Sequence, residues 1–146
     1  MMLSPHFSLA EFTTSPVAAR RGLDNTPGPD SLANLKHLAG TLERVRAWLN
    51  RPVIILSGYR SPLLNRAVGG ARRSAHLTGR AADFICPEYG KVMDVFEAIR
   101  ASGIVYDQLI AEFPGRQNGG WVHIGIADHA RHQALVFDGE SYAEVA

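Results

Sequence analysis

The stretch SAHLTGRAADF, residues 74–84, raises the question that decides how this chain folds. Its second half, AADFI at residues 81–85, is a run of small and apolar residues typical of a buried strand, but Asp83 stands at its centre. A carboxylate in such a run is costly to bury unless a partner compensates its charge. His76 precedes it by seven positions, and the intervening turn Thr78-Gly79 lets the chain fold back. We therefore expect His76 to lie close to Asp83.

A second histidine stands in WVHIGI, residues 121–126, which reads as another strand. Side chains alternate between the two faces of a strand, so the valine and isoleucines take the core face and His123 takes the other. The same alternation places Asp83 on a face with the small residue Ala81, which leaves space around the carboxylate. Asp83 and His123 could then line one depression, with His76 reaching it from the preceding loop.

Two imidazoles and one carboxylate are the ligand set of a catalytic zinc site, whose fourth position is left to water. Zinc would also supply the positive charge that makes the burial of Asp83 tolerable. The alternative is a histidine–aspartate hydrogen bond in the core, with an unrelated histidine at the surface. The spacing H-x6-D is a weak pattern, and by itself it leaves both interpretations open.

Outside these runs, hydrophobic spacing and capping residues predict an α+β domain, with helices in front and strands behind. The predicted helices cover residues 8–12, 15–22, 30–49, 61–69 and 91–102, and Asp30 is the expected N-cap of the longest. The predicted strands cover residues 53–56, 81–85, 108–113, 121–126 and 134–137. The first strand is expected to be buried, and the third and fourth to form a hairpin. We expect a small antiparallel sheet with helices packed on one side, in a single domain of residues 1–146.

The composition is that of an ordinary globular protein, with 146 residues, 46% hydrophobic and 20% charged, and a net charge of +1. This balance gives no basic footprint for nucleic acid. One cysteine, Cys86, excludes an internal disulfide. No apolar run reaches membrane-spanning length, and the first residues lack the pattern of a secretory signal. We expect a monomer that is synthesised in the cytoplasm without a signal peptide and does not insert into the membrane.

Three separated blocks carry a resemblance to a known family: SGYRSPLLNRAVGG at residues 57–70, SAHLTGRAADF, and WVHIGI. In this order and at these distances they resemble the M15 family of zinc D-Ala-D-Ala peptidases, in its small phage and bacterial branch. FSLAEF at residues 7–12 and the long helix also recur in that branch. The resemblance runs from about Phe7 to Ile126.

The resemblance implies roles for individual residues. His76, Asp83 and His123 would be the zinc ligands. Arg60, the arginine of SGYR, would hold a carbonyl or carboxylate of the substrate. Ser74 would lie near the bound peptide.

The general base departs from the family pattern. Many relatives carry a glutamate three residues before the third ligand, where this chain has Gly120. Asp107 and Glu112 are the nearby acidic alternatives. If the apolar residues of 108–113 share the core face with those of WVHIGI, Glu112 shares a face with His123. We therefore predict Glu112 as the base, with Asp107 as the alternative.

The implied mechanism is metal-assisted hydrolysis, in which zinc lowers the pKa of its water. Glu112 would accept the proton and pass it to the leaving amine. Arg60 would orient the peptide or stabilise the oxyanion, and Trp121 would pack on the substrate.

The expected function is hydrolysis of a peptide bond in the stem peptide or cross-link of peptidoglycan. Small size and the absence of a signal fit a phage or prophage endolysin that acts on the cell wall after release. One alternative is a D-Ala-D-Ala carboxypeptidase or dipeptidase that acts on small peptides. Another is a non-catalytic zinc module that binds wall peptides or serves as a phage structural part, which the missing E-x-x-H glutamate favours.

Overall fold

The two strands that carry Asp83 and His123 lie side by side within a six-stranded sheet of order β3-β4-β6-β5-β7-β8. The computed structural model describes residues 1–117 and 119–146. The strands are β3 (Ile54–Ser57), β4 (Ala81–Ile85), β5 (Gln108–Glu112), β6 (Trp121–Gly125), β7 (Gln133–Phe137) and β8 (Tyr142–Glu144). The chain is α+β, as predicted. The pairings are antiparallel except that of β5 with β7, which is parallel.

The predicted hairpin of β5 and β6 is present, with its apolar residues in register. Leu109 lies opposite Ile124, and Ala111 lies opposite Val122. All four side chains are fully buried. Because a one-residue slip would turn every one of them to the other face, burial of this set fixes the register.

The prediction of a buried strand at residues 53–56 is wrong. β3 is an edge strand, and Ile54 and Leu56 are each 46% exposed. A short apolar run does not by itself distinguish a central strand from an edge strand. β3 has a neighbour on one side only, so part of its apolar surface remains in solvent.

The helices are α1 (Leu9–Thr13), α2 (Pro16–Arg21), α3 (Pro29–Leu49), α4 (Pro62–Ala67), α5 (Val92–Arg100) and the 3-10 turn η1 (Ala75–Thr78). Ser8, Ser15 and Ser61 each cap a helix by accepting a backbone N–H. Asp30 is not the N-cap of α3. The helix begins at Pro29, one residue before Asp30, and Gly28 is the N-cap. The ring of Pro29 is preorganised for a first helical turn, which explains the earlier start.

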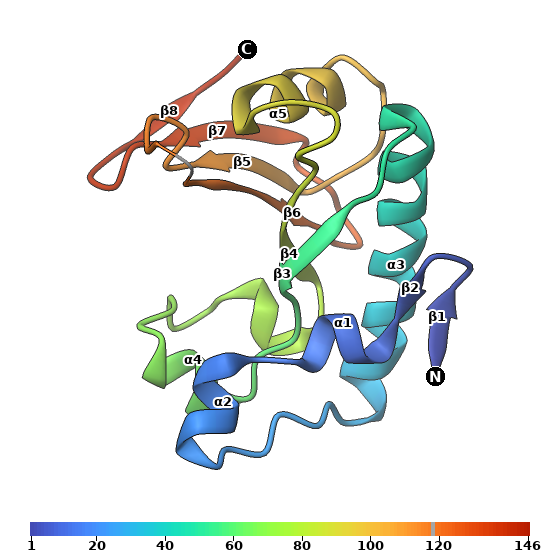
Figure 1. Cartoon of the computed structure of the whole chain (residues 1–146), viewed down its shortest axis with the longest axis vertical. Helices are drawn as coiled ribbons and strands as arrows, with labels where there is room; N and C mark the ends of the chain where they lie inside the picture. The colour runs from blue at the N-terminus through green and yellow to red at the C-terminus, as the bar shows by residue number, and fades with distance from the viewer. Residues whose placement is uncertain (118) are drawn as a thin grey trace.

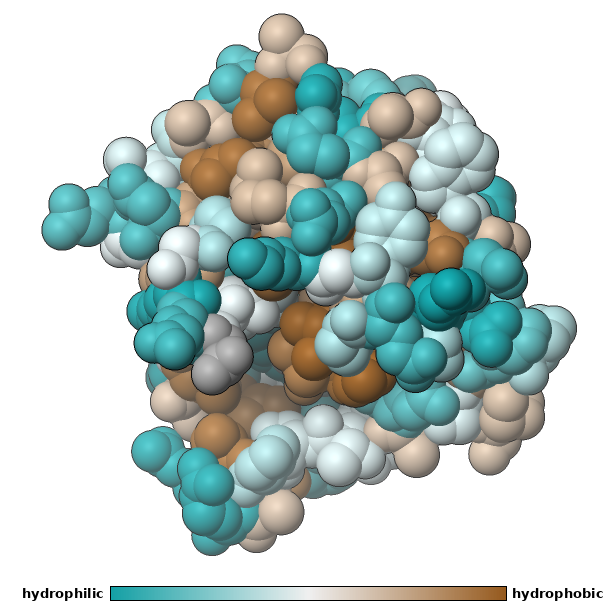
Figure 2. All heavy atoms as spheres, turned by 45° about the horizontal axis from the view of Figure 1, so that its top comes forward, coloured by the Kyte–Doolittle hydropathy of each residue, from teal (hydrophilic) through white to brown (hydrophobic). Residues whose placement is uncertain are grey.

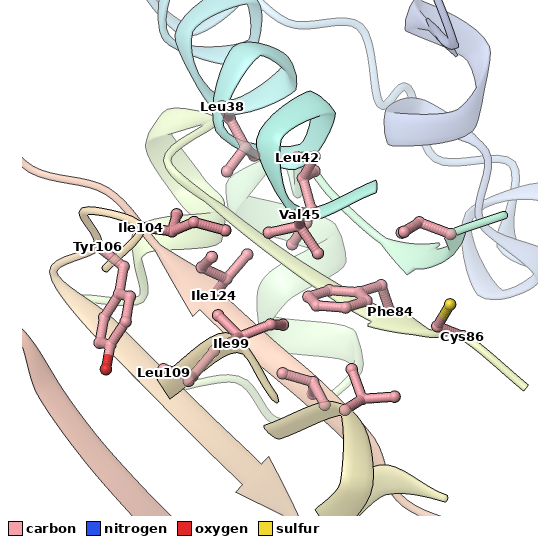
Figure 3. Close-up of a cluster of buried hydrophobic side chains, with 14 of the residues drawn as sticks. Leu38, Leu42, Val45, Phe84, Cys86, Ile99, Ile104, Tyr106, Leu109 and Ile124 are labelled. Carbon is pink, nitrogen blue, oxygen red and sulfur yellow. The ribbon is translucent and has the colours of Figure 1, made fainter. Parts of the chain in front are cut away.

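Helices α3 and α5 pack against one face of the sheet and form the core with it (Figure 1). Figure 3 shows Leu42 and Val45 of α3 above Phe84 of β4, with Ile99 of α5 and Ile124 of β6 in the same cluster. The helices therefore cover the core face, and the opposite face is left for the polar residues of β4 and β6.

Two features of the periphery were not predicted. β1 (Met2–Ser4) and β2 (Phe7–Ser8) form a small antiparallel hairpin beside α3, and β8 extends the sheet beyond β7.

On the face drawn in Figure 2, hydrophobic side chains lie at the bottom of a hollow whose rim is polar. Among the described residues, no helix is both long enough and apolar enough to cross a lipid bilayer.

Candidate active site

Asp83 and His123 lie directly opposite each other on β4 and β6, on the face away from the core. His123 Nδ1 is 2.9 Å from Asp83 Oδ1, and His76 Nε2 is 3.4 Å from Asp83 Oδ2. One nitrogen from each histidine and one carboxylate oxygen lie within 4.8 Å of one another, an arrangement that could hold a metal ion. The prediction that these three residues meet is confirmed. We call them the His-Asp-His cluster.

The position of His76 is fixed by its backbone and by its other ring nitrogen. The Ser74 hydroxyl accepts a hydrogen bond from the His76 backbone N–H at 3.2 Å and caps η1. His76 Nδ1 lies 2.7 Å from the Gly58 carbonyl oxygen. Because a carbonyl can only accept, Nδ1 carries a proton, and Nε2 is the ring nitrogen that faces the cluster. This hydrogen bond leaves Nε2 as the atom that could bind a metal ion.

Gly58 reaches this position only because it lacks a side chain. A Cβ at this residue would lie 2.7 Å from the backbone oxygen of Phe12 in α1. The same oxygen accepts a hydrogen bond from the Tyr59 N–H at 2.8 Å. The first helix of the chain therefore supports the carbonyl that orients His76.

Asp83 is buried, at 7% exposure, yet its carboxyl group is strongly acidic. Burial by itself raises the pKa, but hydrogen bonds from His123 and His76 and their charges outweigh it and hold the pKa well below its usual range. Arg60 Nη2 also lies 3.4 Å from Asp83 Oδ2, the carboxylate oxygen that His76 contacts. The cluster therefore presents an anion and two imidazole nitrogens to one point, which fits a divalent cation.

Arg60 is held beside the cluster by two side chains that sequence analysis did not single out. Its Nε donates to Ser57 Oγ and its Nη1 to Asn65 Oδ1, each at 3.3 Å. Asn65 is 5% exposed and also donates to the Ala71 carbonyl at 3.0 Å. The sequence signal for Asn65 was an amide residue inside a short helix that is followed by two glycines. That signal does not indicate that Asn65 contacts Arg60.

Glu112 stands on the same face of the sheet as His123, as the alternation predicted. It lies opposite Trp121, while Ile110, two residues earlier, lies opposite His123. Burial and the charge of Asp83 raise the pKa of the Glu112 carboxyl, against smaller lowering effects of His123, the Trp121 indole and Arg60. The carboxyl group is therefore in the electrostatic field of the cluster.

Asp107, the alternative base, is engaged elsewhere. Its Oδ1 accepts from Arg131 Nε at 2.9 Å, and its Oδ2 from Arg131 Nη2 at 2.8 Å. The hydrogen bond from Arg131 lowers the pKa of the Asp107 carboxyl more than its burial raises it. Both oxygens are occupied by a bidentate ion pair at the start of β5, which favours a structural role.

Comparison with known families bears on this geometry. A family model described as Peptidase M15 matches residues 5–125, which include every residue of the cluster together with Arg60 and Glu112. The chain belongs to the peptidase M15 family. It is therefore a peptidase of a family that in general depends on zinc, and it carries a His/Asp/His group that could hold the ion. No curated protein matches the chain.

Proposed function

We propose that this M15 peptidase is a zinc-dependent enzyme that hydrolyses a peptide bond in the stem peptide or cross-link of peptidoglycan. The observation that carries the proposal is the His-Asp-His cluster, in which three ligand atoms lie within 4.8 Å around a buried carboxylate. His76, Asp83 and His123 would hold the ion. The choice of peptidoglycan rests on the resemblance of the three sequence blocks to D-Ala-D-Ala peptidases.

In this proposal Glu112 is the general base. Zinc would supply Lewis acidity for the attack of water on the peptide carbonyl. The raised pKa makes the Glu112 carboxylate a better proton acceptor than an exposed glutamate, and the protonated group can then donate to the leaving amine. Support for Glu112 over Asp107 comes from the shared face with His123 and from the ion pair that occupies Asp107.

Three further residues would bind the substrate. The guanidinium of Arg60 is held in place by Ser57 and Asn65, so that its planar fork can orient a carbonyl or carboxylate. The Ser74 hydroxyl accepts from a backbone N–H and keeps its own hydrogen for donation. Trp121 stands on the same face as Glu112 and His123, so its ring could pack on a bound peptide.

Metal binding and cleavage are tested separately. Metal analysis and calorimetric titration should give one zinc per chain, with lower affinity in His76→Ala, Asp83→Ala and His123→Ala. His37→Ala is the matched control, since His37 is exposed on α3 and should bind zinc like the wild type. Zinc uptake that is equal in all four variants would falsify the site.

Cleavage is measured on purified peptidoglycan, with mass spectrometry of the released fragments. The proposal expects fragments from a cut inside the stem peptide or cross-link, and the masses name the bond. Release of single D-Ala residues alone would instead support a carboxypeptidase that acts on small peptides. Intact peptidoglycan after incubation with the zinc-loaded protein would contradict a wall-degrading role. Its place of action in this proposal is the cell wall, reached after release in phage or prophage lysis.

A further inference from the structure

Four side chains stand opposite one another across β6, β5, β7 and β8. Trp121 lies opposite Glu112, Glu112 is in register with Phe137, and Phe137 lies opposite Tyr142. Residues that pair in this way point to the same face of a sheet. Because Trp121 shares its face with His123, all four side chains stand on the face of the His-Asp-His cluster.

The aromatic members of this line contact one another, directly or through Phe113. The rings of Phe137 and Tyr142 are stacked, with centroids 4.4 Å apart and planes 24° apart. The ring of Phe113 lies 5.2 Å from that of Trp121 and 5.3 Å from that of Phe137. We call Trp121, Phe113, Phe137 and Tyr142 the aromatic row.

The outer end of the aromatic row is a surface, since Tyr142 is 58% exposed. The guanidinium carbon of Arg116 lies 3.7 Å from the Phe113 ring centroid and covers that ring. Trp121 stands at the inner end of the row, so Phe137, which is half-buried, and Tyr142 are the rings left for a ligand at the outer end. An exposed tyrosine stacked on a phenylalanine beside a catalytic face offers a flat apolar contact that the packing of the core does not require.

Arg60 and the outer end of the aromatic row lie on opposite sides of the cluster. Arg60 follows β3 at one edge of the sheet, whereas Tyr142 is on β8 at the other edge (Figure 1). Strands are about 4.8 Å apart, so Tyr142 stands about 10 Å from Glu112 across β7. A substrate that Arg60 holds on one side of the reacting bond can therefore extend over Glu112 and reach Tyr142.

The charges near this end disfavour a carboxylate-rich ligand. Glu112 stands between Trp121 and Phe137 on this face. Burial and, as a smaller effect, the charge of Glu112 raise the pKa of the Tyr142 hydroxyl. Asp138, Glu140 and Glu144 lie in β8 and in the turn before it. The free stem peptide carries carboxylates, but the sugar rings to which it is attached offer neutral, flat C–H faces. Electrostatics therefore favour a sugar over more of the peptide.

We infer that Phe137 and Tyr142 form a subsite that binds a sugar ring of the glycan strand attached to the stem peptide. The inference rests on the proposed function and adds a substrate class to it, namely glycan-linked stem peptides rather than free ones. β7 and β8 lie beyond residues 5–125, the part of the chain that the family model matches. The subsite therefore joins Glu112 and Trp121 of the family region to two rings outside it.

The test compares one stem peptide in two forms, free and linked to its disaccharide. The wild-type enzyme should have a higher kcat/KM for the linked form. Tyr142→Ala should reduce this preference by about three- to tenfold, the range of one aromatic contact, and leave cleavage of the free peptide unchanged. Tyr142→Phe keeps the ring and should keep the preference.

A binding measurement without catalysis completes the test. In a Trp48→Phe, Glu112→Gln background, Trp121 is the remaining tryptophan and cleavage is slowed while zinc stays bound. Its fluorescence can then be titrated with the disaccharide-linked peptide. Tyr142→Ala should weaken this binding relative to Tyr142→Phe. Equal kcat/KM of the wild type for both forms, or an equal loss on both in Tyr142→Ala, would overturn the subsite. Failure to cleave either form would instead overturn the proposed function.

Discussion

Glu112 and Asp107 are the two carboxylates that compete for the role of base, and isosteric substitution separates them. Glu112→Gln removes the proton acceptor and should lower kcat by about 10²–10⁴-fold, because a positioned base contributes that much. Zinc affinity should not change. Asp107→Asn is the control, since its partner is Arg131, and it should keep its activity. Loss of activity in Asp107→Asn with full activity in Glu112→Gln would reverse the assignment.

Gly70 tests the support of Arg60. A Cβ at this position would lie 2.0 Å from Asn65 Oδ1 and 2.9 Å from Arg60 Nη1. Gly70→Ala should therefore displace Asn65 and Arg60, raising KM and lowering kcat while zinc remains bound. Gly40→Ala is the matched control, because a Cβ there meets no atom within 4 Å, and it should not affect kinetics. Unchanged kinetics in Gly70→Ala would show that Asn65 does not position Arg60.

Glu43 of α3 holds the β1–β2 hairpin against that helix. Its Oε2 accepts from Ser4 Oγ at 2.6 Å and from the His6 backbone N–H at 2.7 Å. Burial raises the pKa of the Glu43 carboxyl, but hydrogen bonds from Ser4 and His6 outweigh it, so the pKa is lowered. The stabilisation is therefore complete above the ordinary pKa of glutamate and is lost as the pH falls through the lowered value.

Glu43→Gln should accordingly lower the free energy of unfolding by about 1.5 kcal/mol at pH 7, the lower end of the range for hydrogen bonds to a charged group, because Glu43 is only partly buried. The difference from the wild type should shrink as the pH falls toward 3. Urea unfolding at several pH values measures both effects. Glu88→Gln, at an exposed position, is the control and should show little change. A difference that is independent of pH would mean that the charge of Glu43 does not stabilise the hairpin.

The elements that sequence predicted are those with a local signal. Serine caps marked three helices, and alternation of apolar residues gave both the register of β5 with β6 and the face of Glu112. The parallel pairing of β5 with β7 and the edge position of β3 depend on contacts between distant segments, which local patterns do not specify. The cluster itself needed both sources. Its residue types predicted a metal site, but the spacing alone left a plain hydrogen bond equally open.

The role of Asn65 shows why part of the site remained hidden. Its amide matters because Arg60, the Ala71 carbonyl and the bare Cα of Gly70 meet around it. None of these contacts follows a helical or strand period. The sequence therefore indicates that a polar residue lies in α4 but not what it holds.

Metal binding should affect the stability of the whole molecule, because the three proposed ligands come from η1, β4 and β6. A ligand that binds only the folded state stabilises it by about 2.7 kcal/mol at 100 times its Kd. Thermal unfolding should therefore shift upward with added zinc and downward with chelator. Asp83→Asn should reduce the shift, and His37→Ala should retain it. Scanning calorimetry measures each midpoint, and a zinc-independent midpoint in the wild type would argue against binding to the folded state alone.

The direct pairing of β4 with β6 also has a consequence for biosynthesis. Asp83 and His123 are forty positions apart, and α5 and β5 lie between their strands in sequence. Ribosomes add about 5–20 residues per second, so roughly two to eight seconds pass between the synthesis of Asp83 in β4 and that of His123 in β6. During that interval the nascent chain has two of the three residues of the His-Asp-His cluster and an unpaired edge on β4. Hydrolytic activity can therefore begin only after β6 has been synthesised and has paired with β4.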